Sequence, residues 1–190
     1  MIIKKTVYFE KPGRENTAAC VSVVKEAVRE HGYKHLVLAT TGGDTALAMG
    51  GELGGTGLNI VAVTHSAGFK EPNTADLNQE TRKKIASLGI KIFTGPMLTH
   101  SLETSLNNKF NGIYPTMIIA QSLKRFGEGS KVALEVVMMA ADAGLVPEGE
   151  EVLAVAGTAR GADTVLLVRS AVSKRFLELR VLEVLAKPRV

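Results

Sequence analysis

Residues 36–49 read LVLATTGGDTALAM, and this stretch decides the fold that the sequence predicts. The residues HLVLA at 35–39 are apolar without alternation, which is typical of a buried strand in a parallel sheet. Threonines, glycines and Asp44 then interrupt the strand, and a short helix is expected to run to Met49. Bare N–H groups at a helix start, beside hydroxyl groups, form a natural anion site. In the plainer interpretation, Asp44 or Thr41 only caps the helix.

The remaining chain alternates strand-like and helix-like segments, which predicts an α/β fold: a three-layer sandwich with a mostly parallel sheet. Further strands are expected at 58–64 and 91–95, and on both sides of the loop GTARGADT at 157–164. Helices are expected from Asn16 or Thr17 to Gly32, around 77–88, from 115 to 126, and from a cap at Ser130 to a stop at Gly144, while 98–106 allows another.

The C-terminal region is harder to assign. FLELRV at 176–181 alternates, and Val181–Leu182 breaks the alternation. This pattern predicts a bulged or late edge strand at about 175–187, with a helix as the alternative. Because no repeat or low-complexity linker divides the chain, residues 1–190 are expected to form one domain.

Composition narrows the classes of partner and compartment. A hydrophobic content of 45% is enough for a buried core, and the net charge of +4 is scattered rather than gathered in a basic stripe. We therefore expect no nucleic acid partner, and no membrane contact because no apolar run approaches ~20 residues. The start of the chain does not read as a signal peptide, and the single cysteine, Cys20, is expected to be buried in a protein of the reducing cytoplasm.

Several common site motifs are missing. The glycines at 50–57 follow a helix and precede a strand, the reverse of a dinucleotide-binding fingerprint, and no GxxxxGK[ST] loop occurs. The four histidines lack metal-ligand spacing, so no metal site is expected. His65 precedes Ser66 without a GxSxG elbow, which argues against a serine hydrolase.

Three loops carry the candidate site, because each follows an expected strand: 40–45, 64–69 and 157–164. If those strands share one direction, the loops line one edge of the sheet, where ligands collect in α/β folds. Since a phosphate near ionised Asp44 would be repelled, we expect Asp44 to turn aside or to accept from ligand hydroxyls, and Arg160 to balance the phosphate. The candidate binding residues are Thr40, Thr41, Gly42, Gly43, Asp44, Thr45, Thr64, His65, Ser66, Phe69, Gly157, Thr158, Arg160, Gly161, Asp163 and Thr164.

At these residues the sequence resembles the C-terminal α/β domain of pyruvate kinase, and especially the stand-alone archaeal and bacterial proteins of that fold. Thr40, Gly43 and Thr45 match its phosphate loop T-x-S-G-x-S/T, while Gly42 replaces the serine. The catalytic barrel of pyruvate kinase is missing, so that kinase activity is not expected. Asp44 stands where the loop often has a basic residue, which argues against a sugar bisphosphate. The stand-alone group implies flavin mononucleotide (FMN) as the cofactor.

The leading hypothesis is a cytoplasmic protein that binds a phosphorylated small molecule, with FMN as the specific candidate. One alternative is a regulatory or sensor module for a phosphorylated metabolite that performs no chemistry. Another is a redox or hydrolytic enzyme that uses His65 or Asp163. The sequence leaves open whether the chain is an enzyme, what its physiological ligand is, and whether it forms a homo-oligomer.

Overall fold

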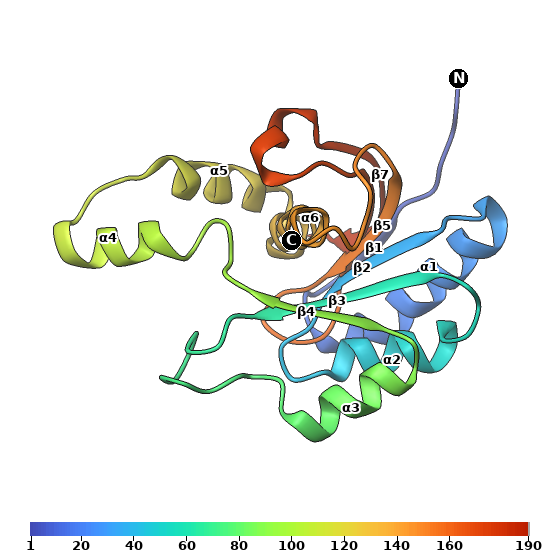
Figure 1. Ribbon diagram of the computed structural model, residues 1–190. Helices are drawn as coiled ribbons and strands as arrows, with labels where there is room; N and C mark the ends of the chain where they lie inside the picture. Colours follow the sequence, from blue (N-terminus) through green and yellow to red (C-terminus); the bar gives the residue numbers. More distant parts are fainter. Residues whose placement is uncertain (190) are drawn as a thin grey trace.

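The computed structural model describes residues 1–189 and shows an α/β fold (Figure 1). Across these residues, seven strands form one sheet in the order β1-β7-β6-β5-β2-β3-β4. The pairs β1–β7, β5–β2, β2–β3 and β3–β4 are parallel, whereas β6 is antiparallel to both of its neighbours. The strands are β1 (Val7–Phe9), β2 (His35–Ala39), β3 (Asn59–His65), β4 (Lys91–Gly95), β5 (Glu151–Ala156), β6 (Thr164–Arg169) and β7 (Arg180–Pro188).

Helices cover both faces of the sheet, as a three-layer arrangement requires. One face packs against α1, α2 and α3, with Cys20 and Val24 of α1 fully buried against it. The other face packs chiefly against α6, whose valines and methionines contact β2, β3, β5 and β6. The α-helices are α1 (Thr17–His31), α2 (Asp44–Leu53), α3 (Gln79–Ser87), α4 (Leu102–Phe110), α5 (Pro115–Leu123) and α6 (Glu128–Asp142), and the 3-10 helices are η1 (Arg14–Asn16), η2 (Lys124–Phe126) and η3 (Ser173–Glu178).

The segment between β4 and α6 forms an arm. In Figure 1, α4 and α5 extend sideways from the layered body, with α4 at the far end. Within the described chain, α4 buries none of its side chains and α5 buries only Ala120. The 98–106 pattern therefore marks a real helix, but the helix begins at Leu102. Its residues Leu102 and Leu106 are exposed, whereas Leu98 precedes the helix and packs against the core on the α6 face.

Three local expectations are corrected. Helix α6 begins after Gly127, not at a Ser130 cap, because the Ser130 hydroxyl donates instead to the Phe126 carbonyl at 2.9 Å. The C-terminal strand β7 is not an edge strand, since β1 pairs along its outer side. Strand β1 has no counterpart in the sequence prediction. The bulge expected in the C-terminal strand is present as two register shifts in the pairing of β7 with β6.

Cys20 is buried, as its valine neighbours predict. Burial, with a smaller contribution from the charge of Asp163, raises the pKa of the Cys20 thiol to about 12. A thiol with such a pKa is protonated and unreactive at neutral pH. Among residues 1–189 there is no helix with the length and apolar character needed to cross a membrane.

Candidate functional site

The three candidate loops meet at one edge of the sheet. Strand β2 is parallel to both β3 and β5, so their carboxyl ends point the same way. A cavity of about 220 Å³ opens there and is lined by residues of all three loops. Eight candidate residues line it: Thr40, Thr41, Thr45, Thr64, His65, Gly157, Arg160 and Gly161. The other eight lie outside its lining: Gly42, Gly43, Asp44, Ser66, Phe69, Thr158, Asp163 and Thr164.

The threonine loop turns on Gly43, the residue that precedes α2. Gly43 has φ 102°, and a Cβ there would come within 2.3 Å of the Thr81 side chain on α3. Both the left-handed backbone and the close approach require glycine at this position. In the described chain no side chain caps α2, so the interpretation of Asp44 or Thr41 as a helix cap is wrong. The first N–H groups of α2 are left available for another acceptor.

Two hydroxyl groups at the cavity have no partner. Thr40 directly follows β2, and Thr64 is the last residue but one of the neighbouring strand β3. They are 6% and 2% exposed, and both line the cavity. Within residues 1–189 the Oγ1 atoms of both threonines are buried without a hydrogen-bond partner. Buried hydroxyls are rarely left so, because the desolvation cost is about 1–3 kcal/mol each. These two threonines are the unsatisfied part of the site.

Asp163 has a structural role, because its hydrogen bonds hold the third loop, residues 157–164, in place. Asp163 is fully buried, and its Oδ2 accepts 3.0 Å hydrogen bonds from the N–H groups of Gly13 and Thr158. Its Oδ1 accepts from the Thr164 hydroxyl at 2.8 Å. Asp163 and Thr164 are thus occupied with shaping the loop and anchoring the N-terminal segment.

Arg160 lies on the wall of the cavity, but it is already paired. Its Nη2 is 3.3 Å from Asp44 Oδ2, and the two side chains are 71% and 68% exposed. An ion pair so exposed contributes about 0–1 kcal/mol and is easily broken. Arg160 therefore offsets part of the charge of Asp44 at the first turn of α2, which reduces the repulsion that Asp44 alone would exert on an anion.

His65 is oriented by a carboxylate. Its Nδ1 lies 2.8 Å from Asp76 Oδ2, and Lys70 Nζ lies 3.0 Å from the other oxygen of Asp76. Burial alone would raise the pKa of Asp76, but the hydrogen bonds and positive charges of His65 and Lys70 lower it overall. The Phe69 ring packs beside the imidazole at a centroid distance of 4.0 Å.

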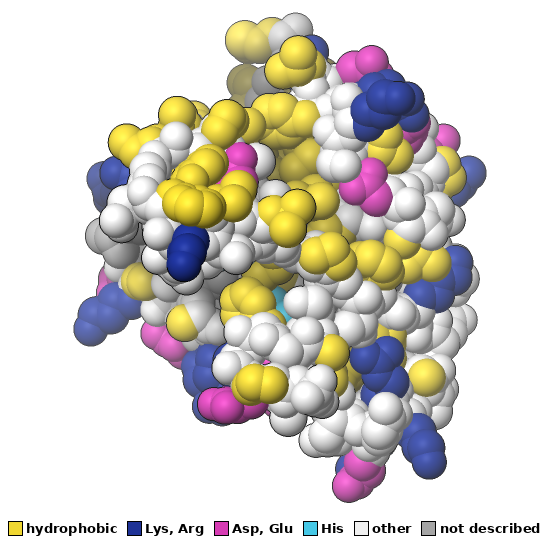
Figure 2. Space-filling model, turned by 60° about the vertical axis from the view of Figure 1, so that its left-hand side comes forward, with side chains coloured by type: hydrophobic (Ala, Val, Ile, Leu, Met, Phe, Trp, Pro, Cys, Tyr) yellow, Lys and Arg dark blue, Asp and Glu magenta, His cyan; other side chains and the backbone are white. Residues whose placement is uncertain are grey.

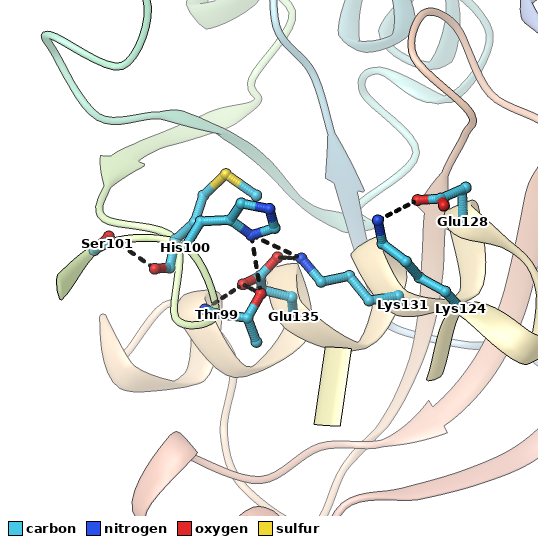
Figure 3. A network of polar contacts seen from close by, with 8 residues as sticks. Thr99, His100, Ser101, Lys124, Glu128, Lys131 and Glu135 are labelled. Carbon is cyan, nitrogen blue, oxygen red and sulfur yellow. Dashed lines mark hydrogen bonds and ion pairs between the residues drawn. The ribbon is translucent and has the colours of Figure 1, made fainter. Parts of the chain in front are cut away.

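On the α6 side of the cavity, Glu135 belongs to a charge network that the sequence prediction missed, and the other members of this network lie behind the cavity wall. Lys131 and Glu135 of α6 are each 2% exposed, and Lys131 Nζ lies 2.6 Å from Glu135 Oε2. Glu135 Oε1 accepts from both the N–H and the hydroxyl of Thr99, each at 2.8 Å. Figure 3 shows these groups converging, with His100 beside Lys131 at 3.4 Å.

Burial, followed by the charge of Lys131, lowers the pKa of His100, so its imidazole is neutral at pH 7. A signal for this network was present in the sequence: Lys131 and Glu135 stand four residues apart in a helix that is apolar on every side. Among residues 1–189 no group of three or more His, Cys, Asp and Glu side chains is arranged to hold a metal ion.

The comparison with protein families agrees with this fold. The model of the pyruvate kinase alpha/beta domain matches residues 18–168. The chain belongs to this family. Among solved structures, the crystal structure of O-ureido-L-serine synthase is similar at 18% identity and a TM-score of 0.33. The match covers 69% of this chain and 48% of that one, so this chain spans about half the length of that protein.

Proposed function

We propose that this pyruvate kinase alpha/beta domain protein binds a phosphorylated small molecule in the cavity at the carboxyl ends of β2, β3 and β5. The observation that carries the proposal is the pair of unpartnered hydroxyls of Thr40 and Thr64 beside the uncapped first turn of α2. Hydroxyl donors and free N–H groups at a helix start suit a phosphate. The positive charge of Arg160 beside Asp44 reduces the repulsion between that carboxylate and a phosphate.

FMN is the specific ligand that we propose for the site. The donor set fits its phosphate and its hydroxyl chain, both of which take hydrogen bonds from threonines and backbone groups. At about 220 Å³ the cavity is smaller than the roughly 300–1,000 Å³ of sites that enclose a whole drug-sized ligand. We therefore expect the phosphate end to be enclosed and the ring system to remain partly exposed. When bound, FMN supplies hydride and single-electron chemistry.

The test compares FMN with riboflavin, which lacks the phosphate. Purified protein is first examined for a flavin absorption spectrum and is then titrated with both ligands by fluorescence. We expect FMN to bind more tightly than riboflavin, and Thr40→Val and Thr64→Val to weaken FMN alone. A hydrogen bond to a charged group contributes about 1.5–3 kcal/mol, so each variant should raise the Kd for FMN at least about tenfold.

A matched control is Thr56→Val, because the Thr56 hydroxyl is bonded to the Leu53 carbonyl, away from the cavity. It should leave both affinities unchanged. Equal affinity for FMN and riboflavin in the wild type, or equal losses for both in the threonine variants, would contradict phosphate recognition. If ribose 5-phosphate binds to the protein and FMN does not, the ligand is a smaller phosphorylated metabolite and not a flavin.

Two related roles follow from the same site. A sensor module would bind the ligand and leave it unchanged. An enzyme is favoured by one specific observation, the imidazole of His65 held by Asp76 on the cavity wall, which is the arrangement of an oriented acid–base group. Asp163 is not available for catalysis, because its carboxylate is fully buried and bonded. The single cysteine, which leaves no disulfide within the chain, supports a cytoplasmic location, which we include in the proposal.

A further inference from the structure

An unusual share of the exposed apolar surface lies on one part of the molecule. Figure 2, which brings the left-hand side of Figure 1 forward, shows hydrophobic side chains gathered around the arm. Eight large apolar side chains on the arm, η2, η3 and the start of β7 are 42–81% exposed: Leu102, Leu106, Phe110, Ile113, Ile118, Phe126, Leu177 and Val181. We call these eight residues the arm patch.

Helix α4 is too short to be stable as an isolated helix. It has nine residues, whereas isolated helices shorter than about 12–15 residues are marginal in water. Its apolar residues Leu102, Leu106 and Phe110 follow one another at intervals of four, which places them on one side of the helix. A polar contact ties α4 to the first turn of α5: Glu103 accepts a hydrogen bond from the N–H of Thr116 at 3.0 Å. The apolar stripe of α4 is therefore open to a partner.

The body of the same molecule presents an apolar groove. Two cavities of about 250 and 280 Å³ adjoin each other, since Leu123 and Phe176 line both. Their walls come from the segment before α4, from α5, α6 and η3, and from the start of β7, and the Lys131–Glu135 pair also lines the larger cavity. The apolar residues that line them are Leu98, Ile119, Leu123, Leu134, Met138, Phe176, Leu177, Leu179 and Val181. An amphipathic helix with anchors one turn apart is the usual occupant of such a groove.

We propose that two copies of this chain form a symmetric dimer in which α4 of each copy lies in the groove of the other. A two-fold interface uses the same patch twice, so it requires that one surface carry both the inserting element and the receiving groove. The arm patch and the groove meet this condition, because Leu177 and Val181 belong to both.

The size and chemistry of the surface match a stable dimer. A large apolar side chain buries on the order of 100 Å². At their observed exposures of 42–81%, the eight residues offer roughly 500 Å² of apolar area per copy. Standard interfaces bury about 800 Å² per partner, of which about 57% is apolar. Residues 102–123 also carry only two charged side chains, Glu103 and Lys109, and charge is depleted at the centres of interfaces.

The first experiment measures mass in solution by sedimentation across a range of concentrations. We expect a dimer of about twice the 20.2 kDa chain mass. Leu102→Glu combined with Phe110→Glu should raise the dimer Kd by at least ~100-fold, since it places two charges in the groove. The melting of the monomeric variant should remain cooperative, because these side chains are 80% and 67% exposed and support no core.

The control is Tyr8→Glu, which changes a 58% exposed residue on β1, the edge strand at the other side of the sheet from β4. This variant should remain dimeric. A wild-type chain that is monomeric at every concentration would overturn the proposal and leave a different protein as the partner of the arm. A dimer that the α4 double variant does not weaken, or that Tyr8→Glu dissociates, would also overturn it.

The second experiment tests the placement of α4. Copies with Leu106→Cys are mixed with copies with Leu177→Cys under mild oxidation, and the linked peptides are identified by mass spectrometry. The native Cys20 does not interfere, because it is fully buried. We expect the mixed 106–177 disulfide to be the main product. Links confined to like pairs, 106–106 or 177–177, would show that α4 does not occupy the partner's groove.

Discussion

Two walls of the same cavity treat their polar groups differently. On the α6 wall, the Glu135 carboxylate lies 2.6 Å from Lys131 Nζ and accepts two 2.8 Å hydrogen bonds from Thr99, so this group is fully partnered. On the strand wall, the hydroxyls of Thr40 and Thr64 are equally buried, but within residues 1–189 they have no partner. Both walls are polar, and burial alone does not distinguish them.

The difference separates structural polar groups from candidate ligand contacts. A completed network contributes to folding, because every charge that it buries is compensated. Buried hydroxyls without a hydrogen-bond partner lower the free energy of unfolding, and they are tolerated where another molecule supplies the missing hydrogen bond. Stability measurements should therefore respond in opposite ways to substitutions on the two walls.

The largest effect is expected at Glu135. Replacing it with leucine leaves the Lys131 ammonium buried without its partner and takes the acceptor from Thr99. Breaking a buried pair costs about 3–5 kcal/mol, so the free energy of unfolding in urea should fall by that amount. Combining Lys131→Met with Glu135→Leu removes both charges and should restore most of the loss. A double variant as unstable as the single one would show that the pair's charges are not what matters.

A smaller effect of opposite sign is expected at the strand wall. Thr40→Val and Thr64→Val remove unpartnered hydroxyls at nearly constant shape, so stability should hold or rise by about 1 kcal/mol. The matched control is Thr164→Val, because the Thr164 hydroxyl donates to the buried Asp163 carboxylate at 2.8 Å. That variant should lose about 1.5–3 kcal/mol in the same urea titration. Equal losses in all three variants would remove the distinction between the walls.

The smallest effect concerns acid stability at Asp76, near the mouth of the cavity. Its pKa is lower in the folded protein than in the unfolded chain, because the hydrogen bonds of His65 and Lys70 outweigh burial. A depressed carboxyl pKa contributes stability that is complete above about pH 4 and is lost as pH falls through the folded value. The wild type should melt at a higher temperature than Asp76→Asn at pH 6, and the gap should close toward pH 2. A gap that is independent of pH would contradict this origin.

The sequence was sufficient for the parts of the fold that depend on local pattern. The continuous apolar run at 35–39 and the glycine corner after it place β2 and α2, and the same reasoning places β3 and β5. The sequence prediction assumed that these strands share one direction, and the structure shows that β2 is parallel to β3 and β5, so their loops meet at one edge. That is why eight of the candidate residues, from Thr40 to Gly161, line one cavity.

Only the tertiary structure decided which polar side chains the chain itself satisfies. Asp163 accepts a hydrogen bond from the N–H of Gly13, 150 residues away in the sequence, and Glu135 accepts one from the N–H of Thr99, 36 residues away. Strand β1 likewise finds its partner in β7 at the other end of the chain. Periodicity and turn chemistry report on neighbours within a few residues, whereas the satisfaction of a buried group depends on atoms that only the folded packing brings near. The sequence thus determined where the cavity lies, and the packing decided that, among residues 1–189, the hydroxyls of Thr40 and Thr64 lack a partner whereas the carboxylate of Asp163 does not.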